Sequence, residues 1–219
     1  EHWMMCAIVG AALLLSGFST VMREQATRQQ YLLRILLRWQ AQHDPLTGLS
    51  NRRHFEEWAN TGFHQARQEC QPVALAIIDV DHFKKYNDHY GHQQGDYALQ
   101  KIARSLQNVA NRPLDLAIRL GGEEFAVIAY GETAESLDAR LHGFMTELRA
   151  LAITHAHSPT ASHMTASIGI CEVMDGENLE SVYQRADQAL YVAKTSGRDR
   201  VVLWGNLPLP AMPVFGSKY

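Results

Sequence analysis

Two acidic stretches of the sequence combine residue types that suit phosphate chemistry with a divalent cation. The adjacent Glu123 and Glu124 follow two glycines and stand between apolar runs, where two like charges repel each other and lose solvent. Another apolar run ends at Asp79, with Asp81 two residues further on. Clustered carboxylates are the oxygen ligands that Mg²⁺ takes while it keeps room for phosphates. If the two runs are neighbouring strands, a carboxylate from each meets at one end of the sheet, and a metal ion offsets their repulsion.

The segment after these aspartates has the features of an anion site. A helix that begins near His82 presents unpaired backbone N–H groups and the positive end of its dipole, and Lys84 adds a charge. Lys194 and Arg198, which follow the last long helix, supply two more cations. Capping of the helix is the structural alternative for the two aspartates, and we favour it for Asp81, the nearer of them.

Regular alternation of helical and strand patterns predicts the elements that must position these residues. Helices are expected at 51–68, 82–90, 96–109, 134–151 and 179–195, and strands at 73–79, 116–120, 125–130, 164–173 and 200–204. Gly121 and Gly122 supply the positive φ angles of a tight hairpin turn, which places the two glutamates at a hairpin tip. We therefore expect one α/β domain over residues 44–204, followed by a proline-containing tail at 205–219.

Composition excludes several classes of function. The chain of 219 residues has a formal net charge of −3, which gives no support to broad nucleic-acid binding by clustered Lys and Arg. Its three cysteines are widely spaced and indicate neither a disulfide framework nor a zinc site. The eleven histidines lack a matching Cys or Glu spacing.

The N-terminal residues predict a membrane attachment. Residues 3–22 carry no charge, and a helix of about 20 residues is long enough to cross a bilayer. We therefore expect residues 1–22 to form the end of a transmembrane helix. A signal peptide and a buried helix are the alternatives. The apolar run is followed by the arginines Arg23, Arg28, Arg34 and Arg38. Because positive charges favour the cytoplasmic side, we expect the downstream domain in the cytoplasm, at the inner membrane. Because the chain opens on Glu1, we interpret it as a fragment of a longer protein.

Residues 23–43 predict a continuous linker helix, because they contain no Gly or Pro and mostly good helix formers. Apolar spacing of i, i+4, i+7 and i+11 indicates a short dimer seam through Leu32, Leu36, Trp39 and His43. An amphipathic helix that packs on its own domain explains the same spacing. The helix should end at residue 43, because Asp44, which precedes Pro45, is pushed out of the helical region.

Five motifs, in order and over residues 44–204, resemble the GGDEF family of diguanylate cyclases. They are DPLTGLSNRR at 44–53, DVDHFKKYNDHYGHQQGD at 79–96, RLGGEEF at 119–125, SIGI at 167–170 and ADQALYVAKTSGRDRV at 186–201. Two positions depart from the usual pattern: Asp199 replaces a more frequent Asn, and Glu123 replaces the Asp that names the family. Many members share the second replacement.

The resemblance implies a palm-like α/β (α+β) domain, with a central mostly antiparallel sheet flanked by helices. It implies condensation of two GTP into cyclic di-GMP, with release of two pyrophosphates. A single domain holds one GTP, and the nucleophile comes from the second. The resemblance therefore implies a homodimer in which two domains face each other, and whatever sets the geometry of helix 23–43 would set the rate.

By position, the resemblance assigns roles to the residues found above. Asp79, the Val80 carbonyl and Glu123 would bind Mg²⁺, with Mn²⁺ as the alternative cation. Glu124 would be a further ligand or would assist deprotonation of the ribose 3′-OH. The guanine-reading positions are Asn87 and Asp96, and the phosphate contacts are Lys84, Lys194, Arg198 and the backbone around His82 and Phe83.

Physical chemistry supports the guanine assignment. A carboxylate such as Asp96 can accept from guanine N1–H and the 2-amino group together, whereas adenine has no such donor pair. Asn87 has both a donor and an acceptor for a base edge. The alternative for both residues is an Asx cap in a loop.

The motif Arg112-x-x-Asp115 matches a product-binding inhibitory site of the family. Arg can clamp phosphate or guanine, and Asp can accept from guanine. The alternative is an ordinary surface turn. For the whole protein, the alternatives to an active cyclase are a catalytically silent cyclic di-GMP receptor and a relative that makes another cyclic dinucleotide.

Overall fold

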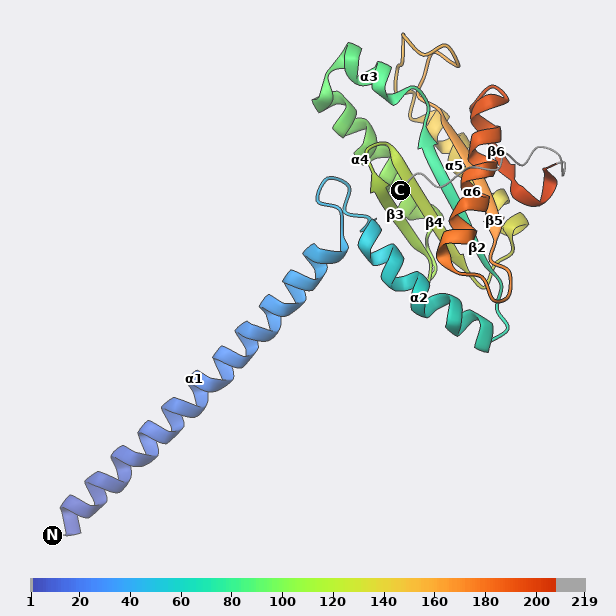
Figure 1. Cartoon of the computed structure of the whole chain (residues 1–219). Helices are drawn as coiled ribbons and strands as arrows, with labels where there is room; N and C mark the ends of the chain where they lie inside the picture. Colours follow the sequence, from blue (N-terminus) through green and yellow to red (C-terminus); the bar gives the residue numbers. More distant parts are fainter. Residues whose placement is uncertain (1, 208–219) are drawn as a thin grey trace. The chain divides into compact units, whose positions relative to one another are not determined.

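The structure is a computed structural model that describes residues 2–207, and of residues 6–15 it describes the backbone alone. The chain separates into two compact units, residues 1–41 and residues 42–219. Helix α1, His2–Gln42, contains all the described residues of the first unit, so the predicted linker helix is present and ends one residue before its expected end. Figure 1 colours the chain from blue to red along the sequence.

Helix α1 exposes many large apolar side chains. Leu32 and Leu36 of the predicted seam are 56% and 51% exposed. In the described part of the chain, no helix is long and apolar enough to cross a membrane. The centre of the predicted transmembrane segment is residues 6–15, whose side chains lie outside the described residues.

The second unit is built on a six-stranded sheet in the order β1-β3-β4-β2-β5-β6. The strands are β1 Ser50–Asn51, β2 Val73–Val80, β3 Leu116–Gly121, β4 Glu124–Tyr130, β5 Ala166–Glu172 and β6 Arg200–Leu203. The central pairs β3–β4, β4–β2 and β2–β5 are antiparallel, and the edge pairs β1–β3 and β5–β6 are parallel. The predicted mostly antiparallel sheet is therefore confirmed.

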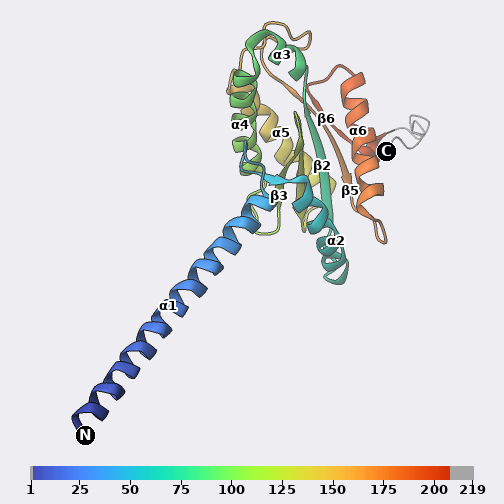
Figure 2. The same ribbon diagram turned by 60° about the vertical axis from the view of Figure 1, so that its left-hand side comes forward.

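Helices cover both faces of this sheet (Figure 2). They are α2 Arg52–Gln68, α3 Phe83–Tyr90, α4 His92–Val109, α5 Ala134–Ala150 and α6 Leu179–Thr195. Alternate residues of β2 enter separate cores, because successive side chains of a strand point to opposite faces. Ile78 packs in the core with α4 and α5, whereas Ile77 packs in the core with α2 and α6. A strand buried on both faces reads as a continuous apolar run, which is how it appears in the sequence.

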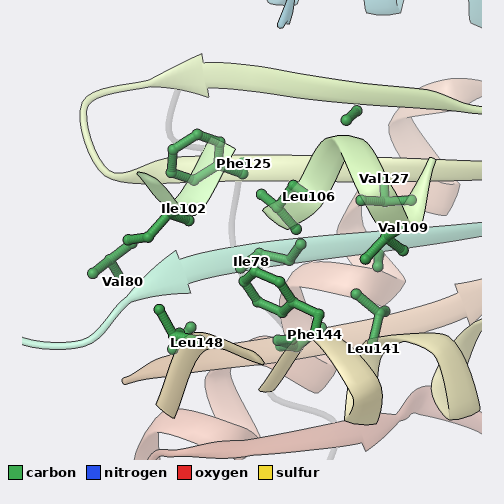
Figure 3. Packing of buried hydrophobic residues seen from close by; sticks show 14 of the residues in the cluster. Ile78, Val80, Ile102, Leu106, Val109, Phe125, Val127, Leu141, Phe144 and Leu148 are labelled. Carbon is green, nitrogen blue, oxygen red and sulfur yellow. The ribbon is translucent and has the colours of Figure 1, made fainter. Parts of the chain in front are cut away.

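Figure 3 shows the core on the α4 and α5 side of the sheet. Strand residues face helix residues there, and the labelled members are Ile78, Val80, Ile102, Leu106, Val109, Phe125, Val127, Leu141, Phe144 and Leu148. Phe125 begins this buried layer directly after the two glutamates and is 0% exposed. The core therefore anchors the strand end from which the acidic residues project.

Two boundaries differ from the prediction for identifiable reasons. Helix α4 begins at His92 rather than at residue 96, because Gly95 is a packing residue of this helix and not a loop residue. A Cβ atom on Gly95 would lie 1.9 Å from Asn87 Oδ1, so glycine is what lets α3 and α4 approach. At the C-terminus, residues 204–206 form a 3₁₀ helix where the tail was expected to begin. Residues 208–219 of the predicted tail lie outside the described residues.

Candidate active site

The two acidic strands are neighbours, which was the condition for the predicted acidic site. Asp79 at the end of β2 pairs in register with Glu124 at the start of β4. The backbone N–H of Val80 donates to the Glu123 carbonyl oxygen at 3.3 Å. Antiparallel pairing thus brings the end of one strand beside the beginning of the other, and the predicted meeting of carboxylates at one end of the sheet is confirmed.

The hairpin tip between β3 and β4 is held by an arginine. Gly121 and Gly122 have φ angles of 149° and 54°, the positive values predicted for this turn. Arg119 donates from Nε and Nη2 to the Gly122 carbonyl at 3.1 and 2.9 Å, and its Nη1 lies 2.9 Å from Asp44 Oδ1. The role of Arg119 was missed in the sequence, because its partner Asp44 is 75 residues away. This bond joins the hairpin to the first turn of the domain.

Asp79 is a partly buried carboxylate next to a cation. Burial raises its pKa to about 6; Lys194 opposes the rise, and the charges of Glu123 and Glu124 add to it. Lys194 Nζ lies 2.8 Å from Asp79 Oδ2. Within the described residues, no group of three or more His, Cys, Asp and Glu is arranged to hold a metal ion. The cation beside Asp79 is here the ammonium group of Lys194.

The predicted cap of α3 by Asp81 is wrong. His82 occupies the N-cap position in a left-handed conformation, with φ 56° and ψ 27°, and its side chain makes no cap hydrogen bond. The first turn of α3 from Phe83 is therefore free of a side-chain cap, and the exposed Lys84 lies in it. The His82 side chain therefore does not cap the backbone N–H groups of this turn, as the predicted anion site requires.

Asp81 instead organises the strand ends around it. Its side chain is fully buried and accepts from Thr165 Oγ1 and Ser167 Oγ at 2.7 Å each. It also accepts from the backbone N–H of Asp199 at 3.1 Å, and Arg198 Nε lies 3.9 Å away. Arg198 and Asp199 both have positive φ, 64° and 47°. The buried carboxylate therefore holds the strained turn that carries Arg198, for which a phosphate contact was predicted.

The two predicted guanine-reading residues lie on adjoining helices. Asn87 is on α3, where its Oδ1 is buried and has no hydrogen-bond partner among the described residues. Asp96 is exposed on α4, one residue after Gly95. Both residues are helical, so the alternative of a loop cap does not describe them. A buried oxygen without a hydrogen-bond partner is costly, so a group that donates a hydrogen bond to it would be favoured there.

The predicted inhibitory pair Arg112 and Asp115 is part of an ion-pair network. Asp115 N–H donates to the Arg112 carbonyl, which confirms a turn. The Asp115 side chain is fully buried, pairs with Arg140 Nη2 at 2.7 Å and accepts from Tyr130 N–H at 3.1 Å. Arg112 Nη1 and Arg140 Nη1 both pair with Glu132. Arg140 and Glu132 were missed, because nothing local in the sequence links α5 to this turn.

Comparison with known proteins agrees with this geometry. The family described as "Diguanylate cyclase, GGDEF domain" matches residues 41–200. The chain is 38% identical over 160 residues to diguanylate cyclase VdcA of Vibrio cholerae, and the aligned region covers 73% of this chain and 46% of VdcA. It is 36% identical over 162 residues to DgcM of Escherichia coli K12, covering 74% and 38% of the two chains. The chain thus spans about half or less of the length of these relatives.

Solved structures are similar as well. The coiled coil and GGDEF domain of DgcB from Caulobacter crescentus, in complex with c-di-GMP, has a TM-score of 0.75 and 31% identity, covering 87% of this chain and 98% of that chain. The active GGEEF domain of a diguanylate cyclase from Vibrio cholerae has a TM-score of 0.63 and 29% identity, covering 71% and 97%. On the extent of the family match and the order of its elements, this chain belongs to the GGDEF-domain diguanylate cyclase family.

Proposed function

We propose that this chain carries the catalytic domain of a diguanylate cyclase, which condenses two GTP into cyclic di-GMP and releases two pyrophosphates. The observation that carries the proposal is the register of β2 on β4, which sets Asp79 against Glu124 with Lys194 beside them. Acidic groups next to a cation at the end of these strands suit attack of a ribose 3′-hydroxyl on an α-phosphate with pyrophosphate as the leaving group, which depends on positioning and charge stabilisation.

The donor atoms at this end of the sheet are of the types that a divalent cation binds. Asp79, the Val80 carbonyl, Glu123 and Glu124 provide the hard oxygen donors that Mg²⁺ prefers, and Mn²⁺ accepts the same donors. The ammonium group of Lys194 already lies beside Asp79, and its positive charge opposes the rise in the pKa of Asp79. Bound there, the metal would supply stabilisation of the charge that develops on the α-phosphate. In this proposal Glu124 binds the metal or assists deprotonation of the 3′-OH.

The rest of the site would bind GTP. Asn87 and Asp96 would read the guanine edge, and the Asn87 oxygen, which has no hydrogen-bond partner within residues 2–207, supports this assignment. The phosphates would meet Lys84, Lys194, Arg198 and the backbone at the start of α3. Asp96 is the residue that would favour guanine over adenine, because a carboxylate can accept from both guanine donors.

We also propose a homodimer and product inhibition. One domain would bind one GTP, so two domains must face each other, and the exposed apolar side chains of α1 support pairing through that helix. Cyclic di-GMP would bind at the half-exposed Arg112, next to Arg140, which Asp115 holds in place. Attachment of the protein to the inner membrane, with this domain in the cytoplasm, remains a prediction from the sequence that cell fractionation can test.

Identification of the reaction products tests the proposed activity. The protein is incubated with Mg²⁺ and either GTP or ATP, and the products are identified by mass spectrometry. We expect cyclic di-GMP from GTP alone. Glu123→Gln with Glu124→Gln should reduce the rate by at least about a hundredfold, because the charge that holds the metal is lost. The exposed Glu180→Gln on α6 is the matched control and should keep the wild-type rate.

Each alternative has its own result in this experiment. Synthesis at the wild-type rate in the double variant would refute the assignment of the metal site. A cyclic dinucleotide made from ATP would indicate the relative with different base specificity. Binding of cyclic di-GMP without any synthesis by the wild-type protein would indicate the silent receptor.

A further inference from the structure

The turn at the start of α3 owes its conformation to a distant loop. His82 has a left-handed backbone, which residues with a Cβ adopt at a cost unless their surroundings hold them. Its carbonyl oxygen accepts from Tyr86 N–H and also from His155 Nε2, each at 3.2 Å. Its ring Nε2 lies 3.1 Å from Thr160 Oγ1. Both the backbone and the side chain of His82 are therefore held by residues 155–160, which are more than 70 positions away.

His155 is built into the interior at this contact. It is 0% exposed, and its ring meets the ring of Tyr86 edge-on, with centroids 5.3 Å apart. Burial lowers the pKa of His155, and the nearby His157, Lys85 and His89 lower it further against the bond to His82. The neutral ring has one N–H, and because a carbonyl oxygen can only accept, that proton is on Nε2.

The loop that carries His155 is held by hydrogen bonds within itself and to α3. His155 N–H donates to Ser162 O at 2.9 Å, and Met164 N–H donates to Ile153 O at 2.8 Å, so the loop closes on itself just before β5. Ala156 N–H donates to the hydroxyl of Tyr90 at 3.1 Å. Figure 1 and Figure 2 both show this loop beside α3. The fold around it, and not α3 alone, therefore maintains the conformation of His82.

We propose that His155 is a positioning residue of the GTP site: by donating to the His82 carbonyl it fixes the turn from which the N–H groups of Phe83 and Lys84 meet the phosphates. The inference rests on the proposed function, because it takes the start of α3 as the phosphate site. His155 does not touch substrate in this account. Its effect is on the direction of the backbone donors, which must be set before GTP binds.

Steady-state kinetics of position 155 variants tests the proposal. His155→Phe keeps a ring of similar size and removes the donor, and we expect it to raise the KM for GTP about tenfold while kcat changes less than about threefold. His155→Gln restores an N–H donor and should return KM to within about threefold of the wild type. Binding of a non-reactive GTP analogue should weaken in the same order. His157→Phe, an exposed histidine of the same loop, should leave KM unchanged.

A second variant covers the case in which His155→Phe does not fold. Thr160→Val removes the hydroxyl beside the His82 ring, and the fold should tolerate it because Thr160 is only partly buried. This variant should raise the KM for GTP about threefold. A folded His155→Phe with wild-type KM would overturn the inference, as would a His155→Gln variant no better than His155→Phe. An inactive wild-type protein would overturn the proposed function as well, whereas an active wild type with a normal His155→Phe variant overturns this inference alone.

Discussion

At the scale of single residues, the ionised carboxylate of Asp79 lowers the stability of the folded chain. Burial raises its pKa to about 6, so the ionised carboxylate is less favourable in the folded chain than in the unfolded one, where the pKa is near 3.8. The cost is absent below pH 4, grows as the pH rises to 6 and is complete above it. This difference in pKa between the folded and the unfolded chain corresponds to about 3 kcal/mol in the free energy of unfolding. Without a divalent ion, the wild-type protein should therefore lose stability over this range.

Replacement of Asp79 by Asn tests this statement. In the absence of divalent ions at pH 8, we expect Asp79→Asn to be as stable as the wild type or more stable by about 1–2 kcal/mol, because Lys194 remains partly solvated. At pH 4 the difference should vanish. Mg²⁺ should raise the melting temperature of the wild type only. Thermal denaturation at both pH values measures each point, and a variant that is much less stable at pH 8 would contradict the role given to Asp79.

At the scale of elements, the β3–β4 hairpin depends on one arginine for its position. Arg119 is mostly buried and connects the hairpin carbonyl of Gly122 to Asp44 in the first turn of the domain. Burial alone would raise the pKa of Asp44, but hydrogen bonds from Thr47 and Arg119 lower it below its usual value. The ion pair is therefore favourable where it lies, and it connects the first turn of the domain to the hairpin whose tip carries the glutamates.

Removal of this connection should loosen the tip. We expect Arg119→Ala to lower kcat about tenfold and stability by about 2 kcal/mol, because the loss leaves the Gly122 carbonyl and Asp44 without their charged partner. Asp44→Asn should have a smaller effect, and the two changes should not add. The exposed Arg104→Ala on α4 is the control. Chemical denaturation and initial rates give both numbers, and additive effects of the two variants would show that the residues act independently.

At the scale of the whole molecule, the catalytic unit alone does not explain two-substrate chemistry. Each domain would present one GTP, so the activity should depend on pairing. Helix α1 has its seam residues Leu32 and Leu36 exposed, and solvent-exposed apolar side chains at heptad spacing favour a paired helix.

Charge substitution on the helix tests the pairing. We expect Leu32→Glu with Leu36→Glu in the full chain to produce a monomer whose specific activity falls at least about tenfold at low concentration and recovers as concentration rises. Gln30→Glu, which adds a charge outside the seam, is the control and should remain dimeric. Light scattering measures the mass and a rate assay measures the activity. A monomer that works at the full rate at every concentration would contradict the dimeric mechanism.

Much of the fold could be predicted because its signals are local. Helix α6 has the predicted bounds, Leu179–Thr195, since an Asn cap, an apolar period and a following glycine lie within one segment. Strand β2 could be recognised from its continuous apolar run. The start of helix α4 was predicted too late, because glycine is typical of loops. The sequence does not show that Gly95 packs against Asn87.

The candidate site divides in the same way. The sequence by itself determined which residues could do chemistry: the carboxylates of Asp79, Glu123 and Glu124 and the order of the strands that carry them. Only the tertiary structure decided that the strands are neighbours in this register, that Asp81 is a buried acceptor and not a cap, and that His155 holds the turn at His82. Side-chain period and turn chemistry act over a few residues, whereas these contacts join positions 45 to 118 apart and depend on the packing of the whole domain.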